Sequence, residues 1–362
     1  MKILYAIQGT GNGHLSRARA IVPALRRHGT VDLLVSGTES EVHLPWPVDF
    51  RCTGLGFVFG KKGGIDYAQT YKRSNVKKLF REIRALPVGT YDVVISDFEP
   101  VSAWACALHG QPCLGLSHQV AVACKKAPRP ARTDLVGKAV LKYYAPVTHA
   151  FGFHFLPYAG HIFPPVIRQE VRALEPVNRG HYTVYLPAYS DERIIRYLRC
   201  FPEVPWEVFS KEARKPFFTD NISIYPISNE GFLHSMGGAE GVFCGAGFET
   251  PAEALYLKKK LLVVPMKGQY EQQCNAAALK ALGVPVLKNL KPKGFACFHQ
   301  WLSDPQSVHL PCPDETNDIV TQVLEAFRSG AQPRALPRRS LDSSSAFRER
   351  LLKKIFYQNG TS

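Results

Sequence analysis

Gly9-Thr10-Gly11-Asn12-Gly13-His14 is the stretch that decides the fold of this chain. It follows the short apolar segment Lys2–Ile7, which is typical of a buried parallel strand. After it, apolar residues recur at helical spacing, at Leu15, Ala18, Val22 and Leu25. The stretch is therefore predicted to be a glycine-rich turn that leads from a first strand into a first helix. Such a turn lets the backbone approach a ligand closely and leaves free N–H groups at the helix N-terminus.

His14 stands at the start of this predicted helix, and its imidazole can take or give a proton near neutral pH. The glycines alone are also compatible with a purely structural turn, which any doubly wound domain needs after its first strand. Their G-x-G-x-G spacing is not the dinucleotide fingerprint, and the predicted second strand Val31–Val35 ends in Ser36 rather than in an acidic residue. The pattern argues against a nicotinamide-dependent enzyme and makes His14 the first catalytic candidate.

Length and composition indicate a globular protein with two domains. The chain has 362 residues, of which 45% are hydrophobic. Its nine cysteines include no C-x-x-C pair, so neither a zinc knuckle nor a disulfide framework is predicted, and reduced thiols fit a cytoplasmic protein. The start of the chain lacks a secretory signal pattern, and no apolar run approaches ~18 residues, so no membrane span is expected.

The formal net charge of +15 indicates an anionic partner. Basic residues gather on two predicted amphipathic helices, one within 72–84 and one within 347–355 near the end of the chain. We expect these helices to help dock the protein on an anionic membrane surface, at the inner face of the cell membrane, with nucleic acid as the less favoured partner. A basic surface without such a partner is the alternative.

Short apolar runs alternate with helical patterns along the chain, which predicts parallel sheets covered by helices. A proline-rich segment interrupts this alternation once. We therefore predict two Rossmann-like α/β domains, residues 1–160 and 181–330, joined by a linker over 161–180. Residues 331–362 form a basic tail rich in Pro, Arg and Ser, and its last helical pattern is expected to pack back on the first domain.

Polar residues follow two further predicted strands of the first domain. Asp97 and Glu99 come directly after Tyr91–Ser96, and His118 comes after the segment Pro112–Leu116. Open α/β sheets bind ligands at the carboxyl ends of their strands, so these side chains join His14 as catalytic candidates. A helix N-cap is an equally good interpretation of Asp97, and a structural hydrogen bond is one for His118.

The second predicted domain contains another glycine turn, Gly245-Ala246-Gly247-Phe248-Glu249-Thr250, which follows the strand Val242–Cys244. The helix after this turn carries Glu253. The strand Leu261–Val264 comes next, and Gln272-Gln273 then stand at the start of another helix. A plain surface position for Glu253 and a solvated helix start for the two glutamines are the simpler interpretations.

Together these motifs resemble the MurG-like GT-B glycosyltransferases. The resemblance rests on Gly9–His14 in the first half and on Cys244–Ala254, Leu261–Pro265 and Gln272–Ala276 in the second. It extends over most of the chain and is strongest around 9–19 and 227–283. Phe248 and Glu249 depart from it, because the family usually has small or apolar residues there. Asn12 among the first glycines and the tail after Arg334 also have no counterpart.

The resemblance implies two α/β domains facing a cleft and an inverting, metal-independent transfer from a nucleotide-sugar, most simply a UDP-sugar, to a hydroxyl acceptor that a lipid could carry. No cofactor is expected, since the nucleotide-sugar is a substrate. His14 would be the general base, with His118, Asp97 and Glu99 in reserve. Glu253 would bind the ribose, and the other donor-binding residues would be Gly11, Gly13, Ile227, Ser228, Gly245, Gly247, Phe248, Thr250, Gln272 and Gln273.

Two rival functions remain open at this point. A non-hydrolysing UDP-sugar 2-epimerase uses the same fold but needs more acidic groups in the cleft, for which Asp97, Glu99 and Glu249 are the candidates. A non-catalytic protein of this fold that binds anionic lipid or nucleic acid would suit the basic composition. The base, the sugar, the acceptor and the oligomeric state are not specified by the residue pattern.

Overall fold

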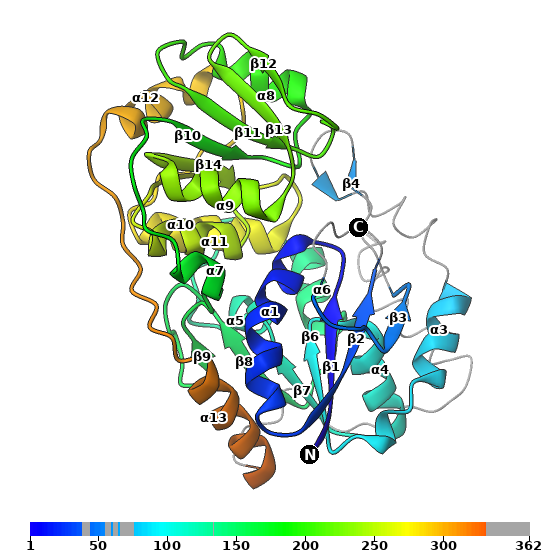
Figure 1. Ribbon diagram of the computed structural model, residues 1–362. Coiled ribbons are helices and arrows are strands. Elements are labelled where there is room, and N and C mark those ends of the chain that lie inside the picture. Colours follow the sequence, from blue (N-terminus) through cyan, green and yellow to red (C-terminus); the bar gives the residue numbers. More distant parts are fainter. Residues whose placement is uncertain (38–43, 55–58, 61–63, 66–75, 133, 331–362) are drawn as a thin grey trace.

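The computed structural model describes residues 1–37, 44–54, 59–60, 64–65, 76–132 and 134–330. These residues form two α/β units, which lie one above the other in Figure 1. All strands of the first sheet fall within residues 2–163, and those of the second fall within 182–264. The predicted fold of two mostly parallel, helix-covered sheets is therefore confirmed.

The first sheet has seven strands in the order β3-β2-β1-β6-β7-β8-β9, and they pair in parallel. Its strands are β1 (Lys2–Gln8), β2 (Thr30–Ser36), β3 (Phe50–Cys52), β6 (Val93–Asp97), β7 (Cys113–Leu116), β8 (His149–Phe153) and β9 (Ile162–Phe163). The short β9 extends the sheet beyond the segment 148–153, which the sequence predicts as the last strand. A separate pair consists of β4 (Phe59–Gly60) and β5 (Gly64–Ile65).

Helices cover both faces of this sheet, which explains why its central strands are continuous apolar runs. Successive residues of β1 point to opposite faces. Ile3, Tyr5 and Ile7 therefore belong to one core cluster, and Leu4 and Ala6 belong to another. The helices of this unit are α1 (Asn12–Arg26), α3 (Val76–Ala85), α4 (Pro100–His109), α5 (His118–Ala123) and α6 (Leu135–Tyr143), with a 3-10 turn at Val88–Thr90.

The second sheet has six strands in the order β12-β13-β11-β10-β14-β15. These are β10 (Tyr182–Tyr185), β11 (Trp206–Ser210), β12 (Phe217–Thr219), β13 (Ile222–Pro226), β14 (Gly241–Gly245) and β15 (Lys260–Val264). Only the edge strand β12 pairs antiparallel, within this sheet. The helices are α8 (Asp191–Leu198), α9 (Asn229–Gly238), α10 (Glu249–Tyr256), α11 (Tyr270–Ala281) and α12 (Phe295–Ser303), with a 3-10 turn at Pro292–Gly294.

The last described helix, α13 (Thr316–Ser329), lies beside α1 of the first unit (Figure 1). Its buried Ile319 and Val323 belong to the same core cluster as Leu25 of α1. The sequence places this segment in the second domain, whereas in the structure it packs against α1 of the first. The linker between the sheets contains the short α7 (Gln169–Arg172). The basic tail 331–362, with its predicted helix, lies outside the described residues, as do Lys72 and Arg73.

Candidate functional site

A cavity of about 810 Å³ is lined by residues of both units. The first unit contributes the turn after β1, the residue after β6 and the start of α5, while the second contributes the starts of α9, α10 and α11. Each of these segments follows the carboxyl end of a strand. The cavity therefore lies where parallel sheets place their ligands.

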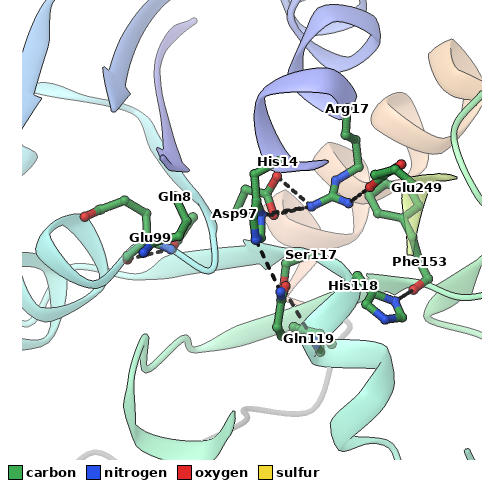
Figure 2. A network of polar contacts seen from close by, with 12 residues as sticks. Gln8, His14, Arg17, Asp97, Glu99, Ser117, His118, Gln119, Phe153 and Glu249 are labelled. Atoms are coloured by element: carbon green, nitrogen blue, oxygen red, sulfur yellow. Dashed lines mark hydrogen bonds and ion pairs between the residues drawn. The ribbon is translucent and has the colours of Figure 1, made fainter. Parts of the chain in front are cut away.

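His14 lies in the first turn of α1, which begins after Gly11 in an extended conformation. Its Nδ1 is 2.9 Å from Oδ1 of Asp97, the fully buried last residue of β6. An ionised carboxylate can only accept here, so Nδ1–H donates. The side-chain amide of Gln119, at the start of α5, lies 3.3 Å from Nε2 (Figure 2). The contact with Asp97 thus orients the ring and leaves Nε2 as the nitrogen that faces Gln119.

Arg17, one helical turn after His14, joins this pair to the second unit (Figure 2). Its Nη2 donates to Asp97 over 2.6 Å and 2.8 Å, and its Nη1 donates to Oε1 of Glu249, the first residue of α10. Arg17 is 2% exposed, so this contact between the units is shielded from water. The guanidinium of Arg17 is thus shared between two carboxylates, one from each α/β unit.

The pKa values in this network follow from burial and from the shared guanidinium. Burial favours the neutral form of Asp97, but Arg17 and His14 outweigh it and lower the pKa of this carboxyl. Burial raises the pKa of Glu249 to about 7, although Arg17 acts in the opposite direction. Asp97 is therefore ionised at neutral pH, while Glu249 gains a proton near pH 7.

Two of the predicted catalytic residues, Glu99 and His118, are engaged in hydrogen bonds within the fold. Glu99 is fully buried and caps α4, accepting hydrogen bonds from the backbone N–H groups of Val101 at 2.7 Å and Ser102 at 2.6 Å. It does not line the cavity formed by the described residues. The N-cap interpretation was thus right for this segment but was assigned to Asp97 instead of Glu99, which lies two residues further on.

His118 is buried between the two units. Its Nδ1 lies 2.8 Å from the carbonyl oxygen of Phe153, its Nε2 lies 2.7 Å from Oδ1 of Asn275, and its ring stacks on Phe248 at 3.9 Å. Burial lowers the pKa of His118 well below its usual value, so it stays neutral. Although it borders the cavity, both of its nitrogens are engaged, which favours the structural role that the sequence left open.

The second glycine turn brings most of its predicted donor-binding residues to the cavity. Gly247, Phe248, Thr250 and Glu253 line it, whereas Gly245 does not. No side chain caps α10 at Phe248, which leaves the first backbone N–H groups of the helix available to a ligand. Phe248, a departure from the family pattern, is used in the stack on His118.

Glu253 is 2% exposed and held by an arginine that the sequence does not single out. Arg168, from the linker, donates through Nε over 2.6 Å and through Nη2 over 2.9 Å to the two oxygens of Glu253. Its Nη1 donates to Asn229 Oδ1 over 2.7 Å. The carboxylate is therefore fixed in one orientation at the cavity wall and is not a plain surface residue.

Most of the remaining predicted donor-binding residues also line the cavity, but one does not. The cavity is lined by Gly11, Gly13, Ile227, Ser228 and Gln272. Gln273 is not among the residues that line it, and Glu271 is present instead, with Oε2 accepting from Gln119 over 3.0 Å. Of the two predicted glutamines, Gln272 therefore lines the cavity and Gln273 does not.

Sequence reasoning missed Arg17, Gln119, Arg168 and Glu271. A signal existed for Arg17, since residues three apart on a helix share a face and His14 was already a candidate. Within the described chain, no cluster of three or more His, Cys, Asp or Glu residues is arranged to hold a metal ion. Among the helices described, none has the length and apolar character needed to cross a membrane.

Comparisons with known proteins agree with this architecture. A family model described as glycosyl transferase family 1 matches residues 1–302. A search of curated proteins gave no match. The crystal structure of Acinetobacter baumannii MurG is similar, with 16% sequence identity and a TM-score of 0.53, over 90% of this chain and 100% of that chain. The Streptomyces sp. SF2575 glycosyltransferase SsfS6, complexed with thymidine diphosphate, has 14% identity and a TM-score of 0.52, over 92% and 96%.

Proposed function

Since this chain belongs to glycosyl transferase family 1, we propose that it transfers a sugar from a nucleoside-diphosphate sugar, with UDP-sugars as the first candidates, to a hydroxyl acceptor. The observation that carries the proposal is that His14, which lines the cavity between the two sheets, is bonded through Nδ1 to the buried carboxylate of Asp97. A general base oriented by a buried carboxylate is what a hydroxyl nucleophile requires.

His14 would act as the base on the acceptor. Its Nε2 takes the proton of the acceptor hydroxyl while that oxygen attacks the anomeric carbon of the donor sugar. Asp97 holds Nδ1–H and stabilises the imidazolium as it forms, because the carboxylate is ionised and shielded from water. Attack opposite the departing diphosphate inverts the anomeric configuration. A base in this position contributes roughly 10²–10⁴-fold to the rate.

The donor would lie against the second unit. Its diphosphate would accept hydrogen bonds from the uncapped N-terminus of α10, whose dipole stabilises the negative charge without a metal ion. Glu253, oriented by Arg168, would accept hydrogen bonds from the ribose hydroxyls, and Glu271 and Gln272 would bind the sugar. Backbone near Ile227 would face the nucleobase of the donor. The thymidine diphosphate named for SsfS6 supports a nucleoside diphosphate as the donor's leaving group.

We further propose that a lipid-linked acceptor would be reached by docking on an anionic membrane. The exposed face of α3 carries Lys77, Lys78, Arg81 and Arg84, while Leu79 and Ile83 are buried in the first unit, so this contact would be electrostatic. Each of these cations would contribute about 1 kcal/mol near such a surface. Sedimentation with neutral and anionic vesicles across a salt series tests this. Equal binding to both vesicle types would contradict it.

The donor is tested first by binding. Thermal shifts with UDP, GDP, TDP and ADP should show one nucleoside diphosphate that raises the unfolding temperature, because ligand binding stabilises the folded state. That nucleotide's sugars are then incubated with hydroxyl acceptors, and the products are analysed by mass spectrometry and by NMR of the anomeric proton. Glycosylated product of inverted configuration is expected. An epimerised nucleotide-sugar formed without acceptor would show the rival epimerase activity instead.

A further inference from the structure

Glu249 has an unusual position for a carboxylate. It is the first residue of α10, at the helix end where the proposed donor diphosphate would lie, and it is 9% exposed. A negative side chain there repels a diphosphate unless its charge is compensated. The compensation comes from Arg17 of the other unit, whose Nη1 donates to Oε1 of Glu249.

The same guanidinium contacts both members of the proposed base. Arg17 Nη2 donates to both oxygens of Asp97 and lies 3.1 Å from His14 Nδ1. If Arg17 had only Asp97 as a partner, its positive charge would neutralise that carboxylate and oppose the formation of an imidazolium at His14. With Glu249 present, two negative charges face one permanent positive charge, and a proton on His14 is stabilised.

We propose that Glu249 completes the catalytic base from the second domain: by sharing Arg17 with Asp97, it leaves the charge of Asp97 available to His14. This inference rests on the proposed function, in which His14 is the base. Glu249 is a positioning residue, since it acts through Arg17 and does not take the acceptor proton.

The packing between the units makes this contact dependent on their close approach. A Cβ added to Gly137 of α6 would lie 2.2 Å from Cβ of Tyr270 on α11, so the two helices touch backbone to side chain. His118 and Asn275 bond across the same interface at 2.7 Å. The contact of Arg17 with Glu249 therefore depends on the packing of the second unit against the first.

Other charged groups that face the network are also taken into account. Tyr5 of β1 donates to Asp97 over 3.4 Å, and Glu271 of α11 is linked to His14 through Gln119. Glu253 lies one turn beyond Glu249 on α10, where it is neutralised by Arg168. None of these groups contacts Arg17 by a hydrogen bond or ion pair within the described structure. The charge on Glu249 thus decides whether the guanidinium of Arg17 is shared between two carboxylates or paired with Asp97 alone.

The test is the pH dependence of kcat/KM for the acceptor, at saturating donor, in the wild-type protein and in Glu249→Gln. Since the pKa of Glu249 is raised to about 7, its charge is present above this pH and lost below it. We expect the wild type to be about ten-fold faster above pH 8, with the ratio falling toward 1 below pH 6. A ratio that is the same at every pH would show a merely structural role and overturn the inference.

Two further variants keep the outcomes distinct. Glu249→Asp restores the charge and should recover most of the wild-type profile, and Glu203→Gln makes the same charge change at an exposed position of the second domain and should leave it unchanged. His14→Ala separates the two claims. If it retains wild-type turnover, the proposed base is wrong. If it abolishes turnover while Glu249→Gln keeps the wild-type profile, only the role of Glu249 is wrong.

Discussion

The two glycine turns of this protein have the same backbone design but opposite charge. Each leads from the end of a buried strand into a helix, β1 into α1 and β14 into α10. The helix after the first turn carries the cation Arg17, whereas the helix after the second carries the anions Glu249 and Glu253. Each anion is held by an arginine from outside its own sheet, Glu249 by Arg17 and Glu253 by Arg168.

This difference shows why neither half can form the site alone. The second turn offers a helix N-terminus suited to a diphosphate, but its carboxylates would repel that ligand without arginines from the first unit and the linker. The first turn offers a base, but its guanidinium needs a second carboxylate from across the interface. The proposed sugar transfer therefore requires both glycine turns, packed against each other.

The largest effect is expected from removing the cation that joins the two turns. Arg17→Met leaves Asp97 and Glu249 buried without their shared partner, and breaking a buried ion pair in this way costs about 3–5 kcal/mol of unfolding free energy. Chemical denaturation measures this, with Arg196→Met as the control at an exposed position of the second unit. Adding Glu249→Gln to Arg17→Met should recover part of the loss. A loss equal to that of the control would mean that the two turns are not joined by this residue.

A smaller effect is expected at the second turn alone. Glu253→Ala should weaken nucleoside-diphosphate binding by about 1.5–3 kcal/mol, the range for lost hydrogen bonds to a charged group. The variant should also lower the stability of the folded state, because Arg168 is 4% exposed and would lose its carboxylate partner. Calorimetric titration and denaturation measure the two effects, with Glu203→Ala as the control. Unchanged affinity in a folded variant would remove the ribose assignment.

The smallest effect is a pH dependence of stability confined to Glu249. The pKa of Glu249 is about 7 in the folded protein, above its ordinary value of 4.5, so the folded state holds a proton that the unfolded state releases between these pH values. Its contribution is complete below about pH 4.5 and lost as the pH rises through 7. The wild type should thus lose roughly 1–3 kcal/mol relative to Glu249→Gln between pH 5 and pH 8. Parallel denaturation curves across this range would argue against a buried, shared carboxylate.

The sequence predicts the strands and turns well because strands buried on both faces must be apolar runs, and glycines mark where a strand passes into a helix. It also predicts that Asp97 lies near His14, since both follow strands whose carboxyl ends share one edge. It does not distinguish Asp97 from Glu99, because either carboxylate can cap the following helix and only the backbone conformation decides which one does.

The sequence does not predict which residues pair across the interface between the two units. Arg17 and Glu249 are separated by 232 positions, and Arg168 comes from a linker whose composition predicts only an irregular connection. The resemblance implies Gln273 as a donor-binding residue, whereas Glu271 lines the cavity. A helix that starts with several polar residues does not reveal its inward face until its first turn is placed. Contacts between the two domains depend on how the domains pack against each other, and no local sequence pattern encodes that packing.

The most direct test of the account is a double-mutant cycle on kcat at His14 and Asp97, measured at saturating donor and acceptor. If the two residues act as one base, His14→Ala should lower kcat by roughly 10²–10⁴-fold, and Asp97→Asn should lower it because His14 loses its orienting carboxylate. The double variant should then be no slower than His14→Ala alone, with donor affinity unchanged. Independent losses that multiply in the double variant, or a His14→Ala protein with near-native turnover, would contradict the account.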